Sequence, residues 1–225
     1  MEFKEYSSKT ALANDLVSRI VAAINQSIDK YGDARILLSG GTTPKFIYEL
    51  VSKSPIDWKK LNVGLVDERY VTSDSEYSNE RLLNESFKDA DEFHVIPMVI
   101  DPENEYQNLI RANNNYTPFF DRVDYILLGM GDDGHTASLF PTDDASESSL
   151  LNDHIGLVST KAPVLPTNRI SCSKQLIVRA SQVDLLILGE KKKKVLSDAA
   201  SHNLPIATIM DQSNQFVVYY TAEKL

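Results

Sequence analysis

Two short apolar runs, each closed by a glycine, constrain the fold of this chain more than any other feature. Residues 123–128 read VDYILL and residues 183–188 read VDLLIL, and Gly129 and Gly189 follow them directly. Strands buried on both faces of a parallel sheet read as nearly continuous apolar runs of this length. We therefore expect two central strands of a helix-covered sheet.

The rest of the chain alternates apolar runs with segments long enough for helices. Near the amino terminus, apolar residues recur at every fourth position, the spacing of one helix face: Leu12, Leu16, Ile20, Ile24 and Ile28. Further strands are expected at residues 34–39, 63–66, 94–96, 207–210 and 217–220, and a long loop at 143–168. Repeated strand and helix units predict an α/β protein with a mainly parallel sheet, formed as a single domain by residues 1–225.

Charge and cysteine content exclude several classes of protein. The chain has 23 Lys and Arg against 32 Asp and Glu, and this net charge of −9 argues against a nucleic-acid partner. Cys172 is the only cysteine, which rules out an intramolecular disulfide and a zinc site built from cysteines. No apolar stretch approaches the ~18 residues of a membrane-spanning helix, so we expect a soluble, cytoplasmic protein without membrane contact. The oligomeric state stays open.

The first of three polar strand ends follows the expected strand at 34–39. Residues 38–45 read LSGGTTPK. Thr43 is a plausible helix N-cap and Pro44 suits a first helical position, so the free N–H groups of the helix start would suit an anion. An ordinary glycine turn between strand and helix explains the same residues equally well.

The second polar strand end carries three charged residues, Asp67, Glu68 and Arg69. Arg69 could bind a phosphate or carboxylate, and Asp67 could contact substrate hydroxyls. Taken alone, a solvated turn with a weak surface ion pair is the better explanation of this segment.

The third polar strand end, residues 129–141, reads GMGDDGHTASLFP. Its glycines match GxGxxG, but Asp132 and Asp133 would repel a pyrophosphate and Pro141 leaves little room for a helix, so we reject dinucleotide binding. A histidine can act as a base near neutral pH when a carboxylate orients it, which suggests His135 beside Asp133. From the pattern alone, a turn histidine bonded to backbone is the commoner case.

Other catalytic patterns are missing from the sequence. It contains no HxH, HExxH or cysteine cluster, so no metal or other cofactor is expected, and it has no GxSxG elbow of an α/β-hydrolase. The lysine run at 191–194 is expected to be mostly a solvated helix start, from which one lysine could turn towards an anion.

Together these segments resemble the 6-phosphogluconolactonase family, within a larger group that includes glucosamine-6-phosphate deaminases and isomerases. The resemblance extends over nearly the whole chain, and its motifs stand in the order of the family. They are residues 38–44, 67–71, 78–79, 129–141, 169–171 and 189–192. The resemblance implies a Rossmann-like three-layer α/β sandwich around a parallel sheet.

The resemblance also implies roles for individual residues. His135 would be the catalytic base, oriented by Asp133. The phosphate of the substrate would lie on the glycine loop, formed by Gly40, Gly41, Thr42 and Thr43, where Thr42 replaces the more usual serine and keeps the hydroxyl.

Four further residues would contact the substrate. Arg69 and Lys192 are implied as cationic partners of the phosphate, beside Asp67. Arg169 matches a recurrent arginine of the family. Lys161 matches a lysine in its proline-rich loop, although residues 162–166 read APVLP instead of the usual consecutive prolines.

The implied reaction is hydrolysis of 6-phospho-D-glucono-1,5-lactone to 6-phosphogluconate in the oxidative pentose phosphate pathway. The partner is thus a small phosphorylated sugar lactone. In the deaminase branch an acidic residue lies five positions after the histidine, where this chain has Phe140. A non-catalytic sugar-phosphate-binding protein is the third possibility, and it would need neither His135 nor Asp133.

Overall fold

The two apolar runs lie side by side at the centre of a seven-stranded parallel sheet. The computed structural model describes residues 1–223; residues 224 and 225, part of the expected domain, lie outside the described residues. Strands β6 (Tyr125–Leu128) and β9 (Val183–Leu188) pair in parallel, and the strand order is β1-β10-β9-β6-β2-β3-β5. The other strands of this sheet are β1 (Glu2–Tyr6), β2 (Ala34–Leu38), β3 (Leu61–Leu65), β5 (Val95–Ile96) and β10 (Phe216–Thr221).

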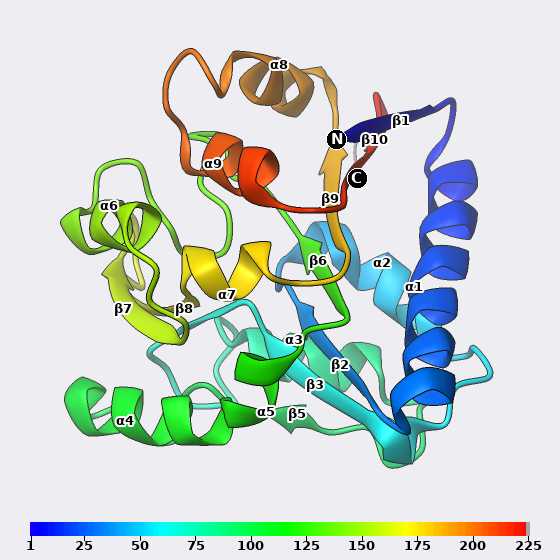
Figure 1. Ribbon diagram of the computed structural model, residues 1–225, viewed down its shortest axis with the longest axis horizontal. Coiled ribbons are helices and arrows are strands. Elements are labelled where there is room, and N and C mark those ends of the chain that lie inside the picture. The colour runs from blue at the N-terminus through cyan, green and yellow to red at the C-terminus, as the bar shows by residue number, and fades with distance from the viewer. Residues whose placement is uncertain (224–225) are drawn as a thin grey trace.

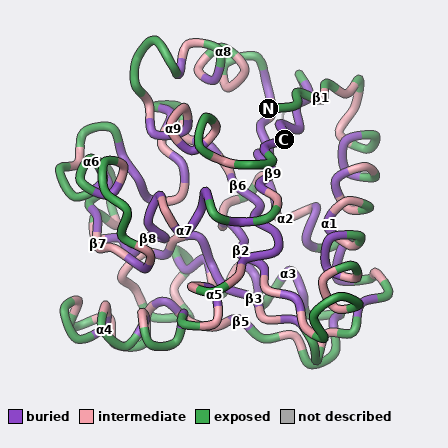
Figure 2. Tube along the Cα trace, viewed as in Figure 1, coloured by how far each residue is buried: buried purple, intermediate pink, exposed green. Residues whose placement is uncertain are grey.

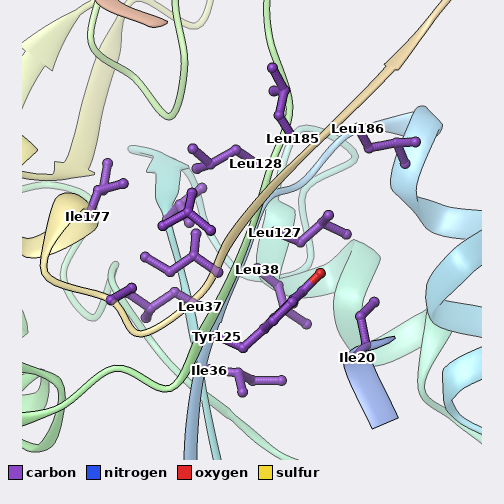
Figure 3. Packing of buried hydrophobic residues seen from close by; sticks show 14 of the residues in the cluster. Ile20, Ile36, Leu37, Leu38, Tyr125, Leu127, Leu128, Ile177, Leu185 and Leu186 are labelled. Atoms are coloured by element: carbon purple, nitrogen blue, oxygen red, sulfur yellow. The ribbon is translucent and has the colours of Figure 1, made fainter. Parts of the chain in front are cut away.

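Helices cover both faces of this sheet (Figure 1). Helix α1 (Lys9–Tyr31) and helix α2 (Thr42–Val51) lie on one side, and α7 (Lys174–Val178) and α9 (Pro205–Gln212) lie on the other. Figure 3 shows Ile20 of α1 and Ile177 of α7 on opposite sides of the central strands. The expected single α/β domain with a mainly parallel, helix-flanked sheet is confirmed.

The remaining helices lie around the ends and edges of the sheet. They are α3 (Asn79–Ser86), α4 (Glu105–Asn115), α5 (Thr117–Asp121), α6 (Asp144–Leu151), α8 (Glu190–Asp198) and the short 3-10 helix η1 (Trp58–Lys60). Figure 2 shows that burial is concentrated in the central strands, whereas the outer sides of α4 and α6 are exposed.

Helix α1 forms where the recurrence of apolar residues at every fourth position predicts it. The hydroxyl of Ser8 caps its start by accepting from the N–H of Ala11, and Gly32 ends it with a φ of 85°, which glycine adopts easily. Leu12 and Ile24 of its apolar face are fully buried. Burial of each such side chain contributes roughly 1.5–3 kcal/mol to the stability of the fold, so this apolar face holds α1 against the sheet.

A second sheet is absent from the sequence-based prediction. Strands β4 (Asp67–Arg69), β8 (Asn168–Cys172) and β7 (Leu157–Lys161) form a three-stranded antiparallel sheet in the order β4-β8-β7. The expected long loop at 143–168 is therefore wrong: it holds α6 and β7. Polar strands such as these lack a continuous apolar run, and the partner β4 lies about a hundred residues away in sequence.

The expected strand at 207–210 is also wrong, because these residues lie in α9. Pro205 occupies the first turn, where its missing N–H is tolerated, and Ile206 and Ile209 bury one helix face. Four residues are too few to separate a strand from a buried helix by periodicity alone. Strand β1 escaped prediction because it is a mostly exposed edge strand of polar sequence, EFKEY.

Candidate active site

The carboxyl ends of β2, β3, β6 and β9 open onto one cavity of about 350 Å³. Its lining includes Gly41 after β2, Asp67 after β3, His135 after β6 and Lys192 after β9. All four strands are parallel, so their carboxyl ends meet at one edge of the sheet, where ligands of open α/β proteins bind. The three polar strand ends noted in the sequence therefore lie together.

The glycine turn after β2 leads directly into α2. The expected N-cap at Thr43 and first position at Pro44 are wrong, because Gly41 is the N-cap and the helix begins at Thr42. The cap residue has a φ of 99°, which favours glycine over threonine, and a proline remains acceptable within the first turn. Gly40, Gly41, Thr42 and Thr43 all line the cavity, and first-turn N–H groups have no partner within the helix. This end of the cavity suits an anion.

Asn79, the first residue of α3, joins the glycine turn to the charged strand β4. Its amide nitrogen donates to the carbonyl of Asp67 at 2.9 Å, and its amide oxygen accepts from Arg69 at 3.0 Å. A Cβ atom on Gly40 would lie 1.9 Å from the same amide oxygen. Asn79 is buried and lines the cavity, yet its only signal in the sequence was its place in the motif at residues 78–79.

Glu68 points away from the cavity and supports it from behind. Its carboxylate accepts hydrogen bonds from the N–H groups of Arg69, Asn79 and Glu80 and from the Ser78 hydroxyl, at 2.7–3.0 Å. Burial raises the pKa of Glu68, although these hydrogen bonds act in the opposite direction. The carboxylate thus ties β4 to the start of α3.

Asp67 links the second sheet to the histidine segment. Its carboxylate accepts from the hydroxyl of Ser138 at 2.6 Å, and the carbonyl of Ser138 accepts from Thr160 of β7 at 2.7 Å. Asp67 also lines the cavity. The residues expected to contact substrate hydroxyls and to activate water are therefore held together.

Arg169 stands directly opposite Arg69 in the antiparallel pair of β4 and β8. It is only 5 % exposed, does not line the cavity, and its Nη1 atom has no hydrogen-bond partner among the residues that the structure describes. Burial, followed by the charge of Arg69, lowers the pKa of Arg169. Two adjacent cations repel each other, and one buried guanidinium nitrogen has no partner within residues 1–223, although the charges of Asp67 and Glu68 act in the opposite direction on the pKa of Arg169. This pair therefore suits a nearby anion.

His135 and Asp133 form a hydrogen-bonded pair at the centre of the third polar segment. The Nδ1 atom of His135 lies 2.5 Å from Asp133 Oδ1, which leaves Nε2 for a ligand. Burial raises the pKa of Asp133, but the hydrogen bond and charge of His135 outweigh it and hold that pKa below its ordinary value. A Cβ atom on Gly131 would lie 2.2 Å from the imidazole, so only glycine fits beneath it. The next helix, α6, begins at Asp144, unlike in a dinucleotide-binding motif.

The lysine run forms the first turn of α8, and only one of its members lines the cavity. Lys192 donates to the carbonyl of Met130 and lies 3.7 Å from Asp132. Its neighbours form ion pairs: Lys191 also with Asp132, Lys193 with Glu5 and Lys194 with Asp198.

Lys161 does not join these residues. It is exposed at the end of β7 and lines a separate cavity of about 540 Å³, together with Asp143 and Pro163. A larger groove of about 870 Å³ between α2 and α3 contains none of the expected site residues. Among residues 1–223, no group of three or more His, Cys, Asp or Glu side chains is placed to hold a metal ion. None of the helices in that range is long and apolar enough to cross a membrane.

Comparisons with known proteins show the family to which the chain belongs. The family described as "Glucosamine-6-phosphate isomerases/6-phosphogluconolactonase" matches residues 7–218. A 6-phosphogluconolactonase of Neisseria meningitidis is 32% identical over 200 residues, covering 87% of each chain. One from Rhizobium meliloti is 34% identical over 192 residues, covering 84% of this chain and 81% of the relative.

A solved structure resembles the whole molecule. The crystal structure of a 6-phosphogluconolactonase from Shewanella baltica superposes with a TM-score of 0.92 at 31% identity, covering 99% of this chain and 98% of the other. The family match therefore extends from sequence motifs to the complete sheet and its helices, and the chain belongs to the family of glucosamine-6-phosphate isomerases and 6-phosphogluconolactonases.

Proposed function

We propose that this chain hydrolyses 6-phospho-D-glucono-1,5-lactone to 6-phosphogluconate, with His135 as general base. The observation that carries the proposal is the contact of His135 with Asp133, at 2.5 Å, on a cavity that also contains the glycine turn and two cations. A base, a carboxylate that orients it and an anion-binding loop are the groups that this reaction requires. The similar proteins named above are 6-phosphogluconolactonases.

The imidazole would move one proton in each direction. Nε2 of His135 takes a proton from water as the water oxygen bonds to the lactone carbonyl carbon. The tetrahedral intermediate then breaks its bond to the ring oxygen, which receives the proton from the imidazolium. Asp133 stabilises the positive imidazolium between these steps, and backbone N–H groups of the glycine-rich segment stabilise the oxyanion. The sum is lactone plus water giving the open-chain acid.

The phosphate end of the substrate would be held by groups from four elements, α2, β4, β8 and α8. These are the N–H groups at the start of α2, Arg69 of β4 with Arg169 beside it, and Lys192 of α8. Asp67 would accept from a sugar hydroxyl. The role of Lys161 stays a prediction, because it lies on a different cavity from the other residues.

The deaminase alternative is disfavoured by what lies next to the imidazole. The ring of Phe140 packs against His135, with 4.6 Å between ring centroids. A phenyl ring cannot take or give the proton that an acidic residue exchanges during ring opening of an amino sugar. A non-catalytic binding protein is disfavoured by the His135–Asp133 contact, which phosphate binding does not need.

Replacing the imidazole tests the proposal. Wild-type protein should hydrolyse the phosphorylated lactone well above the uncatalysed rate, and His135→Ala should lower kcat about 100- to 10,000-fold. Binding of 6-phosphogluconate, measured by calorimetry, should change little because the phosphate contacts remain. Near wild-type turnover in a folded variant would exclude His135 as the base.

Two controls separate the alternatives. Chelator-treated protein should retain full turnover, since the described residues include no metal-ligand cluster. Ammonia release from glucosamine 6-phosphate would instead assign the deaminase reaction. Tight binding of 6-phosphogluconate without any hydrolysis above background would indicate a binding protein.

A further inference from the structure

The charged residues that line the active-site cavity are few. Besides His135 they are Asp67, Arg69 and Lys192. Arg69 is already bonded to Asn79 and to the carbonyl of Tyr77. Among the described residues Lys192 donates one hydrogen bond, to the carbonyl of Met130, so two further N–H donors of its ammonium group remain for an incoming phosphate.

Lys192 also contacts the carboxylate of Asp132, which its neighbour Lys191 contacts as well. Asp132 Oδ2 lies 2.5 Å from Nζ of Lys191, and Asp132 Oδ1 lies 3.7 Å from Nζ of Lys192. Each oxygen of one carboxylate thus faces a different lysine of the same helical turn. Both lysines lower the pKa of Asp132, and the hydrogen bond from Lys191 is the largest cause.

This arrangement sets up a competition for Lys192. Asp132 lies in the loop that carries His135 and does not itself line the cavity. Its charge attracts Lys192 towards the loop and repels a phosphate bound near Lys192. The short contact with Lys191 offsets part of that charge. Side chains that are 52 % and 70 % exposed can exert only a moderate effect of this kind.

We propose that Asp132 and Lys191 set the affinity of the site for the phosphate of the substrate: Asp132 competes with the phosphate for Lys192, and Lys191 limits the competition by pairing with Asp132. This inference rests on the proposed lactonase reaction for its substrate. The two residues act through Lys192 and touch neither the lactone ring nor the imidazole, so they are positioning residues that govern KM and leave kcat unchanged.

The test is a double-mutant cycle with an internal control. Asp132→Asn should lower KM for the phosphorylated lactone about two- to fivefold, and Lys191→Met should raise it by a similar factor, the range of an exposed charge pair. The double variant should behave like Asp132→Asn alone, because Lys191 acts only through the carboxylate. Lys194→Met, which removes a lysine of the same helix that pairs with Asp198, should leave KM at the wild-type value.

Two further readouts distinguish this inference from a purely structural effect. KM for unphosphorylated gluconolactone should be the same in all four variants, and calorimetric binding of inorganic phosphate should follow the same order as KM. Equal KM values for wild type, Asp132→Asn and Lys191→Met would overturn the inference while wild-type turnover still supports the proposed reaction. If wild type hydrolyses no lactone, phosphate binding alone decides: unchanged binding in both single variants overturns the inference.

Discussion

At the scale of single residues, the imidazole of His135 is held by groups that leave it little freedom. Asp133 binds Nδ1, the ring of Phe140 packs against one side, and Gly131 occupies the space beneath it. The backbone reinforces this arrangement, because the N–H of Gly131 donates to the carbonyl of His135 at 2.8 Å. The orientation of the imidazole thus depends on residue 131 having no Cβ atom.

Gly131→Ala should lower kcat while the protein remains folded. Its Cβ atom would lie 2.2 Å from the imidazole and 2.6 Å from the Asp133 carboxylate, so the ring must move away from Asp133. We expect a loss of about 100-fold or more, comparable with losing oriented proton transfer. The measurement is kcat together with the thermal midpoint.

Gly129→Ala is the matched control for this variant. It lies two residues earlier in the same loop, and a Cβ atom there would meet nothing within 4 Å. Because Gly129 also lines the cavity, Gly129→Ala should act mainly on KM, and its kcat should fall much less than that of Gly131→Ala. Similar losses in both variants would show that the loop backbone, and not contact with the imidazole, is what the substitution disturbs.

At the scale of elements, the site depends on the junction between β4 and α3. Glu68 alternates with Asp67 and Arg69 along β4, so it faces the opposite side of the strand. There it accepts four hydrogen bonds, three of them from backbone or side-chain groups of residues 78–80 at the start of α3. Negative charge is favourable at a helix N-terminus, which helps to offset the burial of this carboxylate.

Glu68→Gln should destabilise the protein by roughly 2–3 kcal/mol at pH 7, because an amide nitrogen would face N–H donors. The stability difference should depend on pH. In the folded protein the pKa of Glu68 is raised above its ordinary value of 4.5, so the folded state retains the proton to higher pH than the unfolded state. The contribution of Glu68 is then largest below pH 4.5 and declines as pH rises through the raised pKa.

Urea unfolding at a series of pH values from about pH 4 to about pH 8 checks this prediction. The difference between wild type and Glu68→Gln should shrink as the pH rises. Glu85→Gln, at an exposed carboxylate of the same helix that pairs with Arg81, should leave the midpoint nearly unchanged. A wild-type advantage that grows with pH would show that the hydrogen bonds, and not burial, dominate the pKa of Glu68.

At the scale of the whole molecule, the cations of the site come from two different sheets. Lys192 follows the parallel sheet, whereas Arg69 and Arg169 belong to the antiparallel sheet. Segment 129–141 joins the two, since it begins after β6 and Ser138 bonds to β4. The net charge of −9 is compatible with the proposed phosphate site, because Arg69 and Lys192 line one cavity and exposed charges farther away are screened.

Substituting these cations should separate binding of the phosphate from binding of the sugar. Arg69→Ala and Lys192→Ala should each raise KM for the phosphorylated lactone roughly 10- to 100-fold, since each removes a charge-assisted contact. KM for unphosphorylated gluconolactone should change much less. Lys161→Ala should have the smallest effect, because Lys161 lines a different cavity.

Comparing KM for the two lactones across the three variants checks this prediction. Equal losses on both substrates would mean that Arg69 or Lys192 contacts the sugar or supports the fold. If Lys161→Ala raises KM for the phosphorylated lactone alone, the hairpin of β7 and β8 moves towards the cavity when substrate binds.

The sequence alone determined the inner strands of the parallel sheet and the polar edge of that sheet. Apolar runs and helical spacing are local patterns, so β2, β6, β9 and α1 could be predicted from neighbouring residues. Because parallel strands end at one edge, a sheet with these strands places the Gly41 turn, Asp67 and His135 on the same side of the molecule. The local patterns did not reveal α9 or α6, whose apolar positions are too few for an unambiguous period.

Only the tertiary structure decided which residues complete the site. The antiparallel sheet pairs Arg69 with Arg169, a hundred residues apart, and no local pattern encodes such a pairing. The same folding buries Asn79 against Gly40 and leaves Lys161 on a separate cavity. Local sequence sets which backbone shapes are available, whereas contacts between distant segments depend on how the whole chain packs, and here that packing decided which charges meet.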